Sequence, residues 1–158
     1  MITYRKADIP DIPRVATLRL QFLKEVYPQA DVSRDGLLYE QIARYLTEHL
    51  PKGDFVNLFA EHHGNVVASA GIVFYNQPPL YHNLDGKVAY ILNVYTLPAY
   101  RRQGIAQILM EKLIGEAKER NTGKLSLHAS LEGRRLYERL GFAAGDNEMT
   151  LQLPRIQP

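Results

Sequence analysis

A strand, a proline and the start of a long helix follow one another in the second half of the chain, and this succession constrains the fold most strongly. The apolar run from Lys87 to about Thr96 predicts the strand, and Pro98 ends it. Apolar residues at helical spacing predict a helix from Gly104 to about Arg120, which Asn121-Thr122-Gly123 closes. Another strand is expected over Lys124–Ala129. Strands that alternate with helices predict that part of the sheet is parallel.

An antiparallel hairpin is expected earlier in the chain. Strands are expected at about Val56–Glu61 and Val66–Tyr75, and His63-Gly64-Asn65 between them is typical of a tight turn. Short strands are also expected at Ile2–Arg5 and, as the last element, at Glu148–Leu153. The hairpin argues against a flavodoxin-like nucleotide domain, whose sheet is parallel.

Three further helices complete the expected elements. One follows the capping residue Asp8 and ends near Tyr27, one runs from Ser33 or Asp35 to about Leu50, and a short one covers Leu131–Leu140. The sequence therefore predicts a mixed α/β sandwich, with residues 1–158 forming a single domain.

Composition excludes several classes of protein. The 158 residues contain no cysteine, which removes disulfides, thiolate zinc sites and a cysteine nucleophile. The formal net charge of +2 is too small for a typical nucleic-acid-binding protein. No apolar run approaches the ~20 residues of a membrane span, and the N-terminus lacks a secretory signal. We expect a cytoplasmic protein with no nucleic-acid or membrane partner. We also expect no metal site, because His62-His63, the residue pair that could suggest one, is typical of a solvated turn.

The start of the long helix is the strongest candidate for a binding site. The first N–H groups of a helix have no partner within the helix, and the helix dipole adds positive charge there. Small residues at Gly104 and Ala106 let a phosphate approach the backbone, and Arg101 and Arg102 add charge. The alternative is that Gly104 only serves a turn and that the arginines are solvated.

Two motifs resemble those of the GNAT acetyltransferase superfamily. Arg101-x-x-Gly104-x-Ala106 is similar to its Arg/Gln-x-x-Gly-x-Gly/Ala motif, and Leu136-Tyr137-Glu138-Arg139-Leu140-Gly141-Phe142 resembles its Leu-Tyr-Glu-x-Leu-Gly-Phe segment. The order of expected elements agrees over nearly the whole chain. The resemblance implies a mixed, mostly antiparallel sheet with a splayed parallel strand pair and helices on both faces. It also implies an N-acetyltransferase that uses acetyl-CoA as cosubstrate.

The resemblance also implies where acetyl-CoA binds. Amides from Arg102 to Ala106 would hold the pyrophosphate, and backbone groups of Val94 and Thr96 would pair with the pantetheine arm. Ser130 stands where many relatives have Asn, and it keeps one hydrogen-bond donor. The implied cofactor-binding residues are Leu92, Val94, Thr96, Arg101, Arg102, Gln103, Gly104, Ile105, Ala106, Ser130 and Tyr137.

The implied catalytic groups are Val94, Tyr137 and Asn93. The N–H of Val94 would stabilise the oxyanion of the tetrahedral intermediate. Tyr137 would protonate the departing thiolate, because a phenol stays protonated at neutral pH; the alternative is an amphipathic core tyrosine. No credible general base precedes the motif, so we expect a water chain with Asn93 orienting the amine or the water. Alternatively, Asn93 satisfies a backbone group at a strand bulge.

The acceptor remains open at this stage. A small-molecule amine competes with a peptide or protein amine, and a homodimer is common in the family. The alternative function is a non-catalytic acyl-CoA-binding sensor on the same fold.

Overall fold

The computed structural model describes residues 1–145 and 147–155. By its internal contacts the chain divides into two compact units, of which the first is Met1–His128 and the second begins at Ala129. The first unit carries the sheet and the long helices, and the second carries a short helix. The expectation of a single domain stays a prediction.

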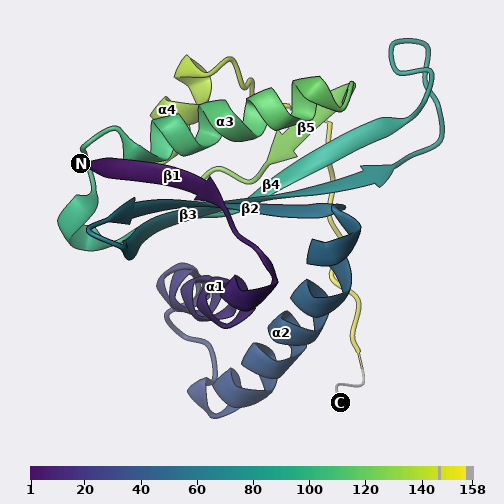
Figure 1. Cartoon of the computed structure of the whole chain (residues 1–158). Coiled ribbons are helices and arrows are strands. Elements are labelled where there is room, and N and C mark those ends of the chain that lie inside the picture. The colour runs from purple at the N-terminus through teal and green to yellow at the C-terminus, as the bar shows by residue number, and fades with distance from the viewer. Residues whose placement is uncertain (146, 156–158) are drawn as a thin grey trace. The chain divides into compact units, whose positions relative to one another are not determined.

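A five-stranded sheet with the order β1-β2-β3-β4-β5 forms the centre of the first unit (Figure 1). Its strands are β1 (Ile2–Lys6), β2 (Phe55–His62), β3 (Asn65–Asn76), β4 (Lys87–Thr96) and β5 (Lys124–Leu127). Neighbours from β1 to β4 are antiparallel, and β4 pairs with β5 in parallel. The prediction of a mixed, mostly antiparallel sheet is confirmed.

Helices cover both faces of this sheet, as predicted. They are α1 (Ile12–Val26), α2 (Asp35–Lys52) and α3 (Ile105–Glu119), with 3-10 turns η1 (Ile9–Asp11), η2 (Val32–Arg34) and η3 (Pro98–Tyr100). In Figure 1, α1 and α2 lie on one face and α3 on the opposite one. Crossing from β4 to β5 through α3 is what allows the two strands to be parallel.

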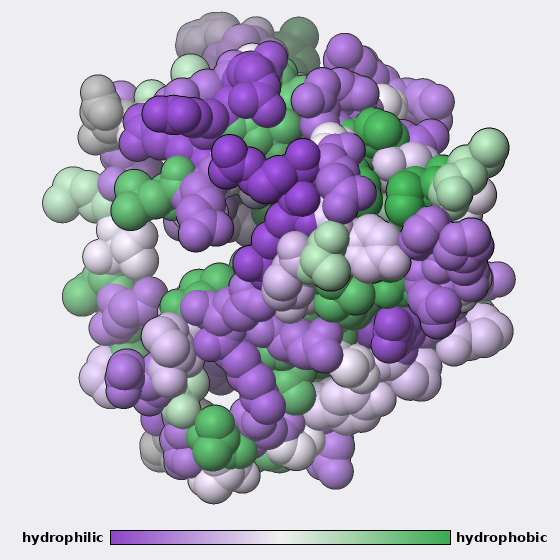
Figure 2. Space-filling view, turned by 90° about the vertical axis from the view of Figure 1, so that its left-hand side faces the viewer, coloured by the Kyte–Doolittle hydropathy of each residue, from purple (hydrophilic) through white to green (hydrophobic). Residues whose placement is uncertain are grey.

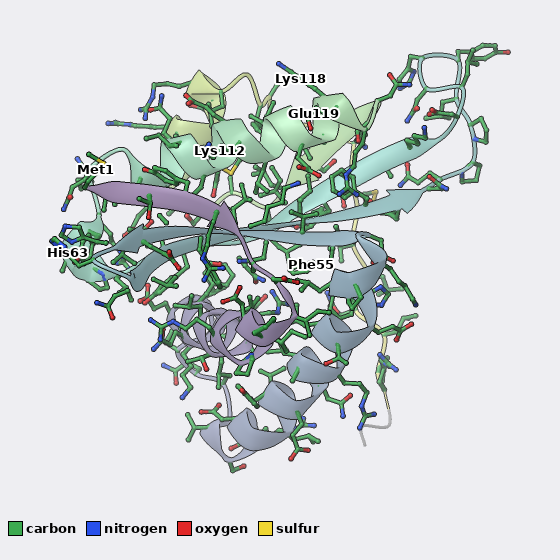
Figure 3. The ribbon with its side chains drawn as sticks, viewed as in Figure 1. Met1, Phe55, His63, Lys112, Lys118 and Glu119 are labelled. Carbon is green, nitrogen blue, oxygen red and sulfur yellow. The ribbon has the colours of Figure 1, made fainter. Side chains whose placement is uncertain are left out.

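Apolar side chains between the sheet and the helices form the core. Phe55, Phe59 and Leu46 are almost fully buried on the side of α1 and α2. Figure 3 shows Phe55 on that side, whereas Lys118 of α3 points away from the sheet. Of the apolar residues at helical spacing, Ile42 and Leu46 of α2 and Leu109 and Leu113 of α3 are buried, whereas Leu38, Tyr45 and Ile108 are exposed.

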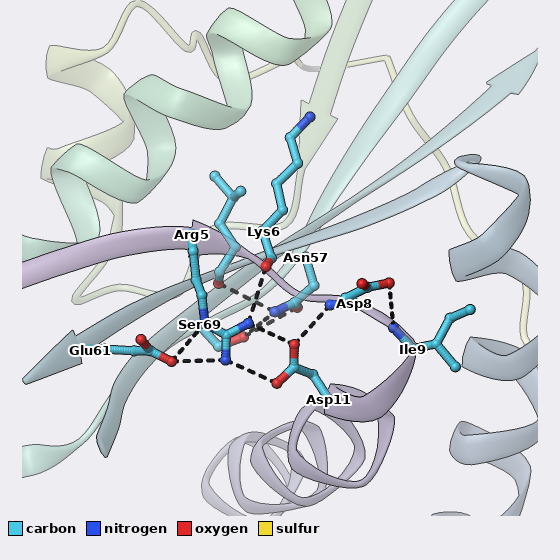
Figure 4. A network of polar contacts seen from close by, with 9 residues as sticks. Arg5, Lys6, Asp8, Ile9, Asp11, Asn57, Glu61 and Ser69 are labelled. Atoms are coloured by element: carbon cyan, nitrogen blue, oxygen red, sulfur yellow. Dashed lines mark hydrogen bonds and ion pairs between the residues drawn. The ribbon is translucent and has the colours of Figure 1, made fainter. Parts of the chain in front are cut away.

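Arg5 ties the first strand to the entry of α1 (Figure 4). Its guanidinium donates to Asp11 at 2.6 and 2.9 Å and to Glu61 at 2.9 Å. Asp11 also accepts from the N–H of Asp8, whose own carboxylate accepts from Ile9 N–H. This capping box satisfies backbone donors at the start of the helical segment, as the capping role expected for Asp8 requires.

The predicted hairpin turn is confirmed between β2 and β3. His63 and Gly64 both have positive φ, 49° and 76°, the backbone of a two-residue turn that matches the twist of the strands. His62 donates to or accepts from the hydroxyl of Tyr100 at 3.0 Å. The face that carries the hairpin is mostly hydrophilic (Figure 2), in keeping with the solvated turn expected for the two histidines.

The second unit differs from the prediction. Its helix, α4, covers only Arg134–Arg139, because the Ser130 hydroxyl and Gly133 N–H form a turn (3.1 Å) just before it. The strand predicted at Glu148–Leu153 does not form, and that prediction was wrong. The alternating side chains that suggested it, Met149 and Leu151 among them, are exposed. Alternating apolar residues show that a segment is able to form a strand, but the strand also needs a neighbouring strand with a free edge.

Candidate functional site

The two parallel strands pair over only part of their length. Residues Val88–Ile91 of β4 are in register with Lys124–Leu127 of β5, and the pairing ends there. The remaining half of β4, Leu92–Thr96, keeps β3 as its partner on the other edge. Within the first unit, this half of β4 therefore presents one edge without a strand beside it.

Backbone groups of Val94 and Thr96 face that unpaired edge. Leu97 N–H donates to Val67 O of β3 at 2.9 Å, and successive residues of a strand face opposite edges. Tyr95 is in register with Ser69 and faces β3, so Val94 and Thr96 face away from it. The carbonyl of Thr96 accepts from Arg101 Nε at 2.9 Å. The open edge lies where the sequence predicted the pantetheine contacts.

A bulge in β4 directs Asn93 toward the helices α1 and α2. Two residues, Asn93 and Val94, stand opposite one residue of β3, Ala70, and Asn93 has a left-handed φ of 57°. An Asn tolerates this conformation better than most residues do. The bulge that the sequence analysis weighed for Asn93 is present.

Asn93 does not use its side chain on a backbone group. Its Oδ1 accepts a hydrogen bond from Arg19 of α1. Its Nδ2 is buried and has no hydrogen-bond partner among the described residues. The alternative in which Asn93 only satisfies a backbone group therefore has no support in this geometry.

The loop before α3 has the conformation of an anion-binding turn. Arg102 and Gly104 both have positive φ, 65° and 79°, and Gly104 is the N-cap of α3. No atom lies within 4 Å of where a Gly104 Cβ would be, so glycine is needed here for its backbone freedom and not to avoid a clash. Successive N–H groups in left-handed and helical conformations form concave sites for anions.

The side chains of this loop have separate tasks. Arg101 binds the Glu25 carboxylate at 2.8 Å and lies over the Tyr95 ring, so its charge is already paired. Gln103 donates to Ala99 O at 3.2 Å and closes the loop on itself. Arg102 is exposed. Among the described residues Arg102 forms no ion pair, so its charge is left for a ligand.

Ile105 and Ala106 form the first turn of α3. Ile105 is buried and anchors the helix on the sheet, and Ala106 adds little bulk beside the backbone. Leu92 of β4 packs among the core residues on the side of α1 and α2. The Leu92 side chain is therefore part of the core, and its backbone is the part that lies at the edge of β4.

Tyr137 lies in the second unit and is largely buried. Its ring meets that of Phe142 edge to face, with 6.2 Å between centroids, and burial raises the pKa of its hydroxyl. A Cβ on Gly133 would come within 2.9 Å of the Tyr137 ring, so the glycine makes room for it. The tyrosine thus stays protonated well above neutral pH, as an acid must.

Sequence reasoning missed two partners within the first unit. The Glu25 carboxylate binds Arg101 and accepts from the hydroxyl of Tyr95, and no local pattern marked it as their partner. Arg19, the partner of Asn93, carried no motif that could have marked it. Both contacts join residues about 70 or more positions apart, and nothing in local spacing reveals them.

Other charged candidates have structural partners. Asp31 caps η2 by accepting from Ser33 N–H, and Asp35 pairs with Lys24. His128 hydrogen-bonds through Nδ1 with the hydroxyl of Tyr90.

Two searches of the described residues, 1–145 and 147–155, were negative. No group of three or more His, Cys, Asp or Glu side chains there could hold a metal ion. No helix there is long and apolar enough to cross a membrane.

The chain resembles known acetyltransferases in sequence and structure. Residues 14–142 match the acetyltransferase (GNAT) family. A predicted acetyltransferase from Clostridium acetobutylicum, solved with acetyl-CoA, is 36% identical, with a TM-score of 0.88 and 96% of each chain covered. A GCN5-related N-acetyltransferase from Ralstonia eutropha is 28% identical, with a TM-score of 0.86 and coverage of 97% of this chain and 99% of that one.

A more distant structure shares only the fold. Glucosamine-6-phosphate N-acetyltransferase from Arabidopsis thaliana is 21% identical, with a TM-score of 0.73 over 98% of this chain and 99% of that one. No curated protein matches the sequence significantly.

Proposed function

Because the chain belongs to the GNAT family of acetyltransferases, we propose that it transfers an acetyl group from acetyl-CoA to a primary amine. The observation that carries the proposal is the unpaired edge of β4 beside the loop that begins α3. A peptide-like pantetheine arm needs free backbone groups along a strand, and a diphosphate needs unpartnered N–H groups at a helix start. The first unit offers both. The acetyl-CoA bound to the Clostridium acetobutylicum relative supports the same cosubstrate.

Each predicted residue has a role in this proposal. The amides of Arg102, Gln103, Gly104, Ile105 and Ala106 hold the diphosphate, and the backbone of Val94 and Thr96 holds pantetheine. Arg102 adds charge, whereas Arg101 positions the loop through Glu25 and Thr96. Leu92 and Ser130 complete the cofactor-binding set.

The proposed reaction is direct attack of the amine on the thioester carbonyl. Val94 N–H stabilises the oxyanion that forms, an interaction whose loss typically costs a few kcal/mol in the barrier. When the C–S bond breaks, Tyr137 donates its proton to the thiolate. The amine loses its proton to water, which Asn93 helps to orient. The role of Tyr137 rests on its motif and on the raised pKa of its hydroxyl.

Thiol release measured with acetyl-CoA and a panel of amines tests the proposal. We expect CoA to appear only when an amine is present, together with a product 42 mass units heavier than the amine, about the mass of one acetyl group added less one proton. Binding of acetyl-CoA without turnover on any amine would instead favour the acyl-CoA sensor. A homodimer and a cytoplasmic location stay predictions.

A further inference from the structure

A cavity of about 250 Å³ lies between α1, α2 and the sheet, beside the β4 bulge. Its apolar wall consists of Ile42, Leu46, Phe55, Val73 and Leu92. Its polar lining consists of Arg19, Gln41, Tyr45 and Asn93. A volume of this order suits a small molecule, and a few polar groups in an apolar wall are typical of ligand sites.

Arg19 gives the cavity a positive charge that no carboxylate balances. It is the one fully charged residue of the lining, and it is half-buried. Among the described residues it forms no ion pair, and its hydrogen bond goes to the neutral amide of Asn93. Burial lowers the pKa of Arg19, which reflects the unfavourable removal of its charge from water. An anionic ligand would balance this charge.

Asn93 also lines the cavity, but its unused donor is enclosed by protein atoms and does not face it. A guanidinium only donates hydrogen bonds, so the oxygen of the Asn93 amide must face Arg19. The NH₂ group is then left over, and it is buried without a partner among the described residues. Buried donors without partners are rare because they are unfavourable.

We propose that the acceptor bound in this cavity is a small amino acid with an apolar side chain, held by its carboxylate. The carboxylate accepts from Arg19, while the side chain packs on the wall that includes Phe55 and Leu92. A single cation balances one carboxylate, whereas a phosphate carries about −1.5 to −2 at neutral pH. Polyamines are disfavoured, because Arg19 repels them and no carboxylate lines the cavity.

This inference rests on the proposed function for its chemistry. The α-amine, deprotonated, attacks the acetyl carbonyl and forms a C–N bond, the C–S bond breaks, and the thiolate takes up a proton. The products are an N-acetyl amino acid and CoA, and no oxidant or metal is needed. Asn93 and Val94 are adjacent on β4, so an acceptor held by Arg19, which contacts Asn93, is next to the N–H proposed for the oxyanion.

Calorimetric binding to the CoA-loaded protein tests the inference. L-phenylalanine is compared with phenethylamine, and L-leucine with isopentylamine, so that each pair differs only in the carboxylate. We expect at least one amino acid to bind tenfold or more tightly than its decarboxylated partner. Arg19→Met should reduce this preference to about twofold or less, and Arg19→Lys should retain at least threefold. Arg44→Met is the matched control, because Arg44 is exposed on α2 and does not line the cavity; it should keep the full preference.

Three results would overturn the inference: neither amino acid binding more tightly than its amine, spermidine binding as tightly as the amino acids, or Arg44→Met losing the preference as fully as Arg19→Met. Thiol release is followed in parallel to separate this inference from the proposed function. An amino acid that binds with an Arg19-dependent preference while no amine is acetylated leaves the cavity assignment standing and refutes the acetyl transfer. If amines are acetylated but no amino acid is preferred over its amine, the acetyl transfer stands and the cavity assignment is refuted.

Discussion

At the scale of single residues, the structure shows which polar groups already have a protein partner and which ones can still bind a ligand. Arg101 is engaged by Glu25, while Arg102 beside it is exposed. Asn93 uses its oxygen and leaves its NH₂ group without a partner among the described residues. Whether a charge or a donor stays available therefore depends on the tertiary contacts of each residue. A residue with a protein partner positions the site, and a residue without one can contact a ligand.

Replacing Tyr137 with Phe tests the proposed general acid. We expect kcat to fall on the order of 10²-fold, because the thiolate then leaves without a positioned proton donor. The dissociation constant of acetyl-CoA should change by less than about twofold, since the ring and its contact with Phe142 are retained. Tyr81→Phe is the control, because Tyr81 is fully exposed. A wild-type kcat in Tyr137→Phe would remove the hydroxyl from the chemistry.

At the scale of elements, irregularities in regular structure mark the candidate site. β4 has a bulge at Asn93, the β4–β5 pairing ends at Ile91, and α3 begins with a left-handed glycine. Each feature frees backbone groups that an uninterrupted strand or helix would use internally. The regular parts of these elements hold the irregular parts in position.

Replacing Gly104 with Ala tests the helix start. A left-handed conformation is strained for alanine by roughly 1–2 kcal/mol, although the space around the Cβ is open. We expect chemical denaturation to show a loss of about that size in unfolding free energy, and calorimetry to show weaker acetyl-CoA binding. Gly115→Ala is the matched control, because Gly115 lies inside α3 with equally open space. There the helix propensity of alanine should stabilise the protein by up to about 1 kcal/mol. Unchanged affinity in Gly104→Ala would argue against a diphosphate at this turn.

The contact between β1 and the start of α1 should weaken in acid. The hydrogen bond from Arg5 is the main cause that lowers the pKa of Asp11. A carboxylate with a lowered pKa stabilises the folded state above its unfolded pKa of about 3.9, and this contribution is lost as the pH falls through the folded value. We therefore expect the stability advantage of the wild type over Asp11→Asn to be present at pH 6 and to shrink below about pH 4. Urea denaturation across this range measures it, and an advantage that grows toward acid pH would contradict the assignment.

At the scale of the whole molecule, ligand binding should stabilise the fold. A ligand present at 100 times its Kd adds about 2.7 kcal/mol to the unfolding free energy, which corresponds to several degrees in Tm for a chain of this size. We expect acetyl-CoA to raise Tm in a concentration-dependent way. S-acetylpantetheine, which lacks the diphosphate, should do so much less at equal concentration. Equal shifts with both compounds would place the binding energy away from the start of α3.

The sequence by itself predicted the strands and long helices of the first unit and the family of the chain. Helical periodicity predicted the long helices, which bury one face, and apolar runs predicted β2 and β3, which are buried on both faces. The tight turn predicted at His63-Gly64-Asn65 is present, and Gly64 adopts the left-handed conformation that glycine allows. The motif from Arg101 to Ala106 predicted the family, which the comparisons confirm.

Only the tertiary structure decided the rest. Alternation at Glu148–Leu153 predicted a strand that does not form, because a local pattern does not provide the partner that a strand requires. The charge on Arg101 is paired, and the amide of Asn93 is half-used, because Glu25 and Arg19 reach them from a helix far away in the sequence. The cavity that Arg19 and Asn93 line arises between two helices, α1 and α2, and three strands, β2, β3 and β4, and no segment of the chain encodes it alone. Backbone conformation follows from residues that are neighbours in sequence. Whether a charge or a hydrogen-bond donor is free depends on residues that are distant in sequence and come close only in the folded protein.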